Sequence, residues 1–86
     1  MNNKNKILIE LEIPIIEKKY DLFIPINKKV GTIKSLLEKA LVELSDGAYL
    51  IKSDTNFYNK DDGSIYDVNQ NVRDTDLKNG SRIILL

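Results

Sequence analysis

Residues 32–47 read TIKSLLEKALVELSDG, and this is the one segment of the chain with a strong helical period. Its apolar side chains recur at i, i+3, i+4, i+7, i+8 and i+11, the spacing of one helix face. They are Ile33, Leu36, Leu37, Ala40, Leu41 and Leu44. A lone helix of this length is marginal in water, so the apolar stripe requires a partner surface. One helix with one apolar face predicts one sheet.

The ends and the polar side of this helix carry further predictions. The Thr32 hydroxyl can accept a hydrogen bond from an unpaired N–H of the first turn, which predicts an N-cap there. Gly47 suits the left-handed residue that closes a helix. Glu38 falls on the polar side, where Val42 is the one apolar residue and a weak candidate for a contact.

Two segments that alternate between apolar and polar residues precede the helix. Residues 7–13 and residues 20–26 each place aliphatic side chains on one face, so both are predicted to be strands. The short connection between them predicts a hairpin. Pro25 has no N–H to donate, which favours an edge position for the second strand.

The chain after the helix is less regular. Residues 49–53 are a short β-rich run, predicted to be a third strand. Residues 54–70 are rich in Gly, Asn and Asp, which predicts a loop with one or two very short strands. Val72 and Leu77 bracket a polar turn and are expected to hold this loop against the core. Asn79-Gly80 is a turn signal, and residues 82–86 are the predicted last strand.

These elements predict an α+β fold in which one helix packs on a mixed sheet of four to five strands. In the simplest arrangement the last strand lies parallel to the first, inside the sheet. That is the β-grasp, or ubiquitin-like, arrangement. Residues 1–86 are expected to form a single domain, with the polar residues 1–5 disordered.

The composition excludes several classes of function. The chain has no Cys and no His, which rules out disulfides, zinc–thiolate sites, thiol nucleophiles and the most common general base. Its 13 basic residues balance 13 acidic ones, so binding to nucleic acid or to an anionic membrane is not expected. No apolar run suits a membrane span or a secretory signal, which predicts a cytoplasmic protein without membrane insertion.

Motifs for catalysis, metals and cofactors are missing as well. Counted from Asp54, the EF-hand pattern needs Gly and Glu where this chain has Asn59 and Ile65. Phosphate-binding loops and cysteine ligands for an iron–sulfur cluster are absent from the sequence. The pair Asp61-Asp62 has no apolar setting that would shift a pKa. We therefore expect a protein that is not an enzyme and that uses no metal and no cofactor.

A family resemblance suggests a setting for this fold. Residues 71–85, NVRDTDLKNGSRIIL, resemble the ending of ubiquitin-like proteins, with an Asn-Gly-x-Arg turn followed by aliphatic residues. Residues 20–25 and 33–37 resemble the second strand and the helix start of the YukD/EsaB family. These are small bacterial ubiquitin-like proteins associated with type VII (ESX/WXG100) secretion loci. The resemblance implies a non-catalytic accessory protein that docks on a component of the secretion machine, such as a membrane-bound subunit.

Two other functions are weighed against this one. A free-standing β-grasp adaptor unrelated to secretion is the alternative. Ubiquitin-type conjugation is not expected, because the chain ends in Ile84-Leu85-Leu86 where ubiquitin ends in Gly-Gly.

The candidate binding site is a set of aliphatic side chains on the open face of the sheet. Alternation turns Leu8, Ile84 and Leu86 away from the helix, and Ile51 lies on the predicted third strand. These four residues are predicted to form one apolar patch, on the face that ubiquitin uses for recognition. A protein partner, self-association into a weak homodimer, and no role at all are open for this patch, since exposed aliphatic residues are common.

Overall fold

The two alternating segments before the helix form an antiparallel hairpin. The computed structural model describes residues 5–86 and has strand β1 at Lys6–Ile13 and strand β2 at Lys18–Pro25. A short 3-10 helix, η1 at Pro14–Ile16, makes the turn, and Glu17 follows it with a left-handed φ of 54°. Ile9, Leu11 and Ile13 are buried, as the alternation predicts.

The start of the chain is described from Asn5 onward. The Asn5 carbonyl oxygen accepts a 2.9 Å hydrogen bond from the Ile26 N–H, which extends the hairpin by one pair. Of residues 1–5, which are predicted to be disordered, residues 1–4 lie outside the described residues.

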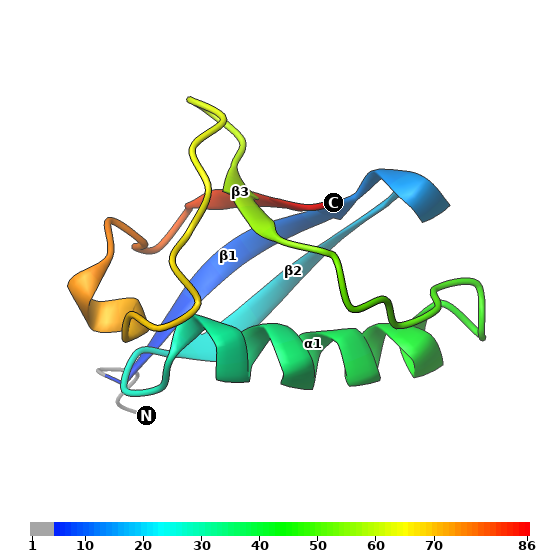
Figure 1. The fold of residues 1–86 in the computed structure, drawn as a ribbon, viewed down its shortest axis with the longest axis horizontal. Helices are drawn as coiled ribbons and strands as arrows, with labels where there is room; N and C mark the ends of the chain where they lie inside the picture. Colours follow the sequence, from blue (N-terminus) through cyan, green and yellow to red (C-terminus); the bar gives the residue numbers. More distant parts are fainter. Residues whose placement is uncertain (1–4) are drawn as a thin grey trace.

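The sheet has the order β2-β1-β4-β3 (Figure 1). Strand β3 is Phe57–Asn59 and strand β4 is Arg82–Leu85. Strand β4 runs parallel to β1, with Leu11 opposite Ile83, and antiparallel to β3. This confirms a mixed sheet whose last strand lies inside it, parallel to the first. Strand β2 is at the edge, as Pro25 predicts.

The prediction of a strand at residues 49–53 is wrong. The Tyr49 N–H donates to the Ser45 hydroxyl at 2.8 Å, and the Tyr49 hydroxyl donates to the Glu38 carboxylate at 2.7 Å. These hydrogen bonds hold the start of the segment on the helix, away from the sheet. The third strand forms later, inside the segment predicted to be mostly loop.

Helix α1 covers Val30–Leu44, and its ends differ from each other in how they are capped. Thr32 lies inside the helix, so its predicted N-cap role is wrong. The N–H groups of Val30 and Gly31 instead donate to the carbonyl oxygens of Gln70 and Val68, at 2.8 and 2.9 Å. The backbone of the long loop thus takes the place of a side-chain cap. At the other end Gly47 has a φ of +83°, which confirms its predicted left-handed conformation.

The helix buries a face that is rotated from the predicted stripe. Leu36 and Leu44 are 51% and 53% exposed, whereas Glu38 is only 3% exposed. Val42 packs against the core, so the prediction that it faces solvent is wrong. The cause is the chain after the helix, which covers the flank that carries Glu38 and supplies a second packing surface. Hydrophobic periodicity does not report such a surface.

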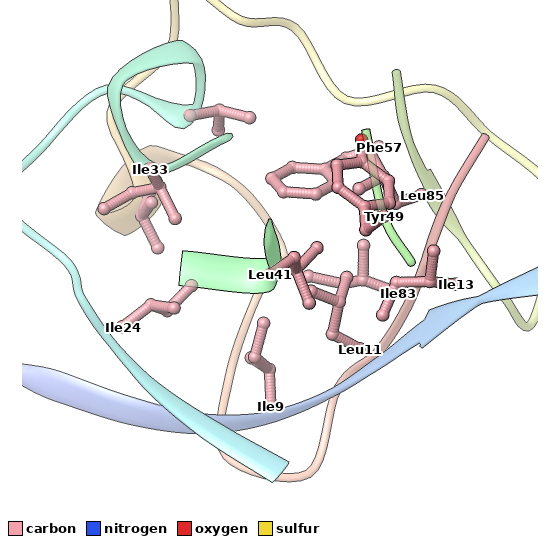
Figure 2. Close-up of a cluster of buried hydrophobic side chains, with 12 residues drawn as sticks. Ile9, Leu11, Ile13, Ile24, Ile33, Leu41, Tyr49, Phe57, Ile83 and Leu85 are labelled. Carbon is pink, nitrogen blue, oxygen red and sulfur yellow. The ribbon is translucent and has the colours of Figure 1, made fainter. Parts of the chain in front are cut away.

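The core lies between the helix and the sheet, and residues from before, within and after the helix contribute to it. Leu41 is fully buried at its centre, with Ile24 and Ile33 on one side and Tyr49 and Phe57 on the other (Figure 2). Val72 in the 3-10 helix η2, Val72–Asp74, is 1% exposed, and Leu77 packs against the cluster. The structure therefore confirms that these two residues attach the long loop to the core.

Candidate protein-interaction surfaces

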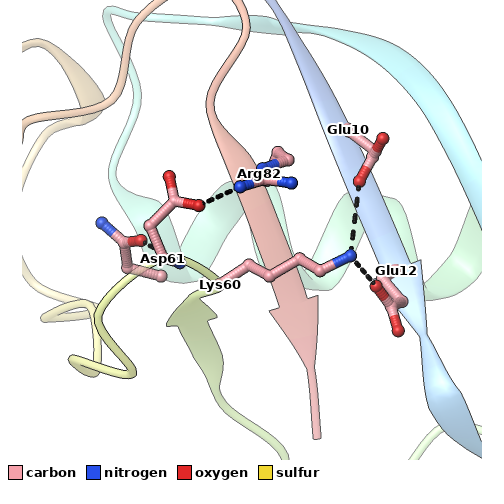
Figure 3. Close-up of polar contacts among 6 residues, drawn as sticks. Glu10, Glu12, Lys60, Asp61 and Arg82 are labelled. Atoms are coloured by element: carbon pink, nitrogen blue, oxygen red, sulfur yellow. Dashed lines mark hydrogen bonds and ion pairs between the residues drawn. The ribbon is translucent and has the colours of Figure 1, made fainter.

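The open face of the sheet, which is turned away from α1, carries an ion cluster at its centre. The Lys60 ammonium lies 2.6 Å from Glu12 and 3.9 Å from Glu10 (Figure 3). Arg82 pairs with Asp61 beside them. The two glutamates come from β1, Arg82 from β4, and Lys60 and Asp61 from the turn after β3. Polar side chains thus occupy the middle of the face on which an apolar patch is predicted.

The pairing in this cluster holds both partners in their charged forms. The pKa of the Glu12 carboxyl lies below its ordinary value, chiefly because the Lys60 ammonium donates a hydrogen bond to it. The same hydrogen bond raises the pKa of Lys60. Water screens the pair, since each side chain is 26% exposed. The cluster therefore shapes the charge pattern of this face more than it stabilises the fold.

The four residues predicted to form one apolar patch do not converge. Leu8 stands at one end of the open face. Ile84 lies opposite Glu12, which is four residues beyond Leu8 in β1. Four residues of a strand span roughly 13 Å, and the ion cluster fills the interval. Ile51 is exposed but belongs to no strand. Leu86 follows β4 and lines a groove at the other end of the sheet. A binding role for these residues stays a prediction.

That groove is lined mainly by apolar side chains, and we call it the Leu50 groove. Its volume is about 370 Å³. Three large aliphatic residues on its walls are more than half exposed: Ile15 at 65%, Leu50 at 68% and Leu86 at 57%. The remaining lining residues are Ala48, Tyr49, Lys52, Asp54, Thr55 and Leu85. Exposed apolar side chains that gather at a concave site are typical of protein-binding surfaces.

Beneath the groove, a buried polar network fixes one of its walls to the helix. The Glu38 carboxylate accepts hydrogen bonds from the Tyr49 hydroxyl at 2.7 Å, from the Lys34 ammonium at 2.8 Å and from the Thr55 hydroxyl at 3.4 Å. Every buried side-chain nitrogen and oxygen in the described part of the chain has a partner. A carboxylate can be buried at low cost when donors surround it in this way. The segment from Tyr49 to Thr55 is therefore held in a defined position.

The network also shifts the pKa values of its members. Burial alone would raise the pKa of Glu38, but the hydrogen bonds from Lys34 and Tyr49 outweigh burial and lower it. Burial, followed by the hydrogen bond to Glu38, raises the pKa of the Tyr49 hydroxyl well above its ordinary value. At neutral pH the carboxylate is charged and the phenol is neutral, which is the pairing that this hydrogen bond requires.

Sequence reasoning missed two of the three exposed aliphatic residues of the groove, because neither lies in an α-helix or a strand. Ile15 is in η1 and Leu50 is in the segment wrongly predicted to be a strand. A period assigns a face only to residues of a helix or strand. One signal was available: Leu50 and Ile51 are adjacent, so a strand would have exposed one of them.

A second apolar surface lies on the helix itself. Leu36, Ala40 and Leu44 are all exposed and stand at the spacing i, i+4, i+8, one above the other along α1. We call these three residues the outer stripe. The sequence predicts all three to be buried under the sheet, and the rotation of the helix leaves them in solvent.

The loop of residues 54–70 uses its carboxylates to stabilise its own turns. Asp62 accepts from the N–H and the hydroxyl of Ser64, and Asp67 accepts from the N–H of Asn69. Among residues 5–86, no three His, Cys, Asp or Glu side chains are placed to hold a metal ion. Within the same described range, no helix is long and apolar enough to cross a membrane.

Comparison with known proteins identifies the fold. No protein-family model and no curated protein sequence matches the chain. The ubiquitin-like domain of the Mycobacterium tuberculosis type VII secretion protein EccD1 is similar in structure, with a TM-score of 0.73 at 13% identity, over 94% of this chain and 97% of that domain. Ubiquitin of Caldiarchaeum subterraneum gives a TM-score of 0.68 at 14% identity, over 93% of this chain and 90% of that one.

A larger protein contains the same arrangement as one part. A chain of the MycP5-free ESX-5 inner membrane complex matches with a TM-score of 0.78 at 14% identity, over 95% of this chain. The protein described here spans 21% of the length of that chain. Together with the topology, these likenesses show that the chain has the α+β β-grasp fold of ubiquitin-like domains.

Proposed function

We propose that this chain is a non-catalytic protein-interaction module and an accessory component of a type VII (ESX/WXG100) secretion system, of the YukD/EsaB kind. The likeness to the EccD1 domain and to a chain of the ESX-5 inner membrane complex supports the setting. Both are parts of type VII machines, and the match covers nearly all of the EccD1 domain. The chain would then act by docking on a subunit of such a machine, on the cytoplasmic side of the membrane.

The Leu50 groove is the observation that carries the interaction part of this proposal. Ile15, Leu50 and Leu86 expose more than half of their surface in one concave site. Lys52 and Asp54 stand on its rim and offer one charge of each sign. A buried apolar anchor with a polar rim is the usual design of a protein-binding site.

The same observations favour binding over catalysis. The sequence has neither His nor Cys, and the buried carboxylate of Glu38 is saturated by three donors. The charged residues of the open face pair with one another and face solvent. A general acid or base needs a free group with a pKa near neutrality, and the pKa of Glu38 and that of Glu12 are both shifted away from it.

Secretion of a WXG100 substrate from the native host tests this proposal. We expect deletion of the gene to reduce secretion and the wild-type gene to restore it. Leu50→Asp, which places a charge in the groove, should fail to restore secretion. Ile65→Asp is the matched control, because Ile65 is 57% exposed but lies outside the groove, and it should restore secretion fully. Circular dichroism of both purified variants would show that they are folded.

Three results would contradict parts of the proposal. Normal secretion in the deletion strain would remove the secretion role and favour a free-standing β-grasp adaptor. Equal behaviour of Leu50→Asp and Ile65→Asp in a strain that does need the gene would remove the groove as the docking site. A gene neighbourhood without an FtsK/SpoIIIE-like ATPase would point to the adaptor as well.

A further inference from the structure

Three segments that are far apart in the sequence meet at one end of the molecule. The Ile26 N–H donates to the Asn5 carbonyl oxygen at 2.9 Å, and the Ile26 carbonyl oxygen accepts from the Arg73 N–H at 3.0 Å. Close by, the Lys28 carbonyl oxygen accepts from the Val72 N–H at 2.9 Å. The start of β1, the turn before α1 and the 3-10 helix η2 therefore lie side by side (Figure 1).

Four basic side chains come together on these segments. They are Lys6, Lys28, Lys29 and Arg73, and all four are exposed. Because consecutive Cα atoms are about 3.8 Å apart, the Cα atoms of Lys6, Lys28 and Arg73 lie within roughly 10 Å of the Cα atom of Ile26. Salt screens charges over a similar length, about 8 Å at physiological ionic strength, so an anion at this end is attracted by several of the charges at once. We call the four basic residues the basic end.

The basic end is not neutralised by the rest of the molecule. None of its four side chains makes an ion pair with a residue in the described range 5–86. Residues 5–6, 25–29 and 70–74 hold one acidic residue, Asp74, against these four cations. The remainder of the sequence has nine basic and twelve acidic residues. A net charge of zero thus conceals a local excess of positive charge, which favours an anionic partner at this end.

We propose that the basic end binds an acidic segment of a partner protein, in the form of a flexible stretch with several consecutive Asp or Glu residues. The Arg73 guanidinium can donate two parallel hydrogen bonds to one carboxylate, and the three lysines pair with others as point charges. Roughly 23 Å of β1 separates this end from the Leu50 groove, whose wall residue Ile15 follows the other end of the strand. The inference goes beyond the proposed function, because it depends neither on the secretion setting nor on the groove.

Other anionic partners fit the basic end less well. Nucleic-acid surfaces combine basic residues with exposed aromatic ones, and residues 5–6, 25–29 and 70–74 contain no aromatic residue. Stable attachment to an anionic membrane needs an inserted apolar group besides the charges, and these segments expose no large apolar side chain. A second copy of this chain would supply its own carboxylates, but such a head-to-tail contact does not close on itself and leads to open chains.

The test is an NMR titration of the ¹⁵N-labelled chain with a synthetic peptide of six alternating Asp and Glu residues, at about 50 mM salt. We expect saturable shifts of the amides of residues 5–6, 26–29 and 71–74. Affinity should fall about tenfold or more for the charge-reversed variant Lys28→Glu/Arg73→Glu. A peptide with Asn and Gln in place of Asp and Glu should not bind.

The matched control is Lys18→Glu/Lys39→Glu, which changes the net charge by the same amount at exposed residues outside the basic end. This variant should bind the peptide nearly as the wild type does, because the affinity depends on where the charges lie. Circular dichroism would show whether both variants are folded. If the first variant is unfolded, Lys6→Gln/Lys29→Gln takes its place, with Lys18→Gln/Lys39→Gln as its control.

Several outcomes would overturn the inference. They are no saturable shifts at millimolar peptide, shifts spread over all exposed lysines, and equal losses of affinity in the variant and its control. Binding to phosphatidylglycerol vesicles without binding to the peptide would assign the basic end to a membrane surface. Shifts that follow protein concentration without peptide, together with association in sedimentation, would assign it to a second copy. Each of these results leaves the secretion test untouched, because that test reports on Leu50, and a failed secretion test leaves this titration standing.

Discussion

The two flanks of helix α1 depart from the hydrophobic pattern in opposite ways: one buries a carboxylate, and the other leaves leucines exposed. On one flank, a carboxylate is 3% exposed under the segment from Tyr49 to Thr55. On the other flank, Leu36 and Leu44 are about half exposed beside the free edge of the sheet. The two flanks differ in their neighbours: the chain returns over one of them and leaves the other open.

Burial along the helix therefore depends on the available hydrogen-bond partners as well as on hydrophobicity. Glu38 is buried because Lys34, Tyr49 and Thr55 supply its donors, so little desolvation cost is left uncompensated. Exposed leucines lose only the free energy that their burial would have contributed. That free energy becomes available when a partner covers them, which is why the open flank is the place to look for one.

The largest effect is expected from shortening Leu41, which is fully buried between the two flanks. Leu41→Ala should lower the free energy of unfolding by about 2–5 kcal/mol, since it leaves a cavity in the core. Leu36→Ala on the open flank should cost less than about 1 kcal/mol. Urea denaturation measures both. Similar losses for the two variants would mean that the outer stripe is part of the core, and that no free surface exists there.

The next effect concerns the closed flank. Glu38→Ala leaves the Tyr49 hydroxyl and the Lys34 ammonium without their acceptor, so we expect a loss of about 2–3 kcal/mol. Glu43→Ala is the control, because Glu43 is an exposed residue of the same helix. Hydrogen exchange should show that Glu38→Ala opens residues 49–55 before the rest of the chain unfolds. If both variants have the same stability, the network does not hold the loop.

The order of the elements and the faces of β1, β2 and β4 follow from local rules, and for that reason the sequence predicts them. Alternation with period two assigns Ile9, Leu11 and Ile13 to the core, and Pro25 assigns β2 to an edge. The rotation of α1 depends on a segment that returns to the helix from 11 residues away, through the hydrogen bond between Tyr49 and Glu38. The hydrophobic period of the helix does not report that contact.

The candidate sites were less predictable for the same reason. Leu8, Ile84 and Leu86 lie outside the core, on or beyond the strands that alternation identifies. The register of β4 on β1 separates Leu8 from Ile84, and Lys60, which reaches Glu12 across 48 residues of sequence, places a charged group between them. The Leu50 groove forms between η1, the segment after the helix and the end of β4, and these three segments are far apart in the sequence.

A pH titration that compares variants isolates the closed flank, because the pKa values of Glu12 and Asp62 are also lowered and that of Tyr66 is also raised. The pKa of Glu38 is lowered in the folded state, so its contribution is present above the ordinary value near 4.5 and is lost as the pH falls below it. The pKa of Tyr49 is raised, so its contribution is present below the ordinary value near 10 and is lost as the pH rises above it. Stability of the wild type should therefore fall at both extremes. Glu38→Gln and Tyr49→Phe should flatten the acid and alkaline limbs respectively, in thermal melts from pH 3 to 11.

The smallest effect is expected on the open face of the sheet, where water screens the ion cluster. Lys60→Met removes the hydrogen bond that lowers the pKa of Glu12, so an NMR titration of the Glu12 carboxyl should show that pKa return upward towards its ordinary value. The unfolding midpoint should change less than in Glu38→Ala, and the change should vanish at high salt. Lys39→Met, an exposed residue of α1, is the control. A large, salt-independent loss of stability in Lys60→Met would show that this pair acts as a structural contact like that of Glu38, and the contrast between a buried network that orders a loop and a surface cluster that only sets charge would then fail.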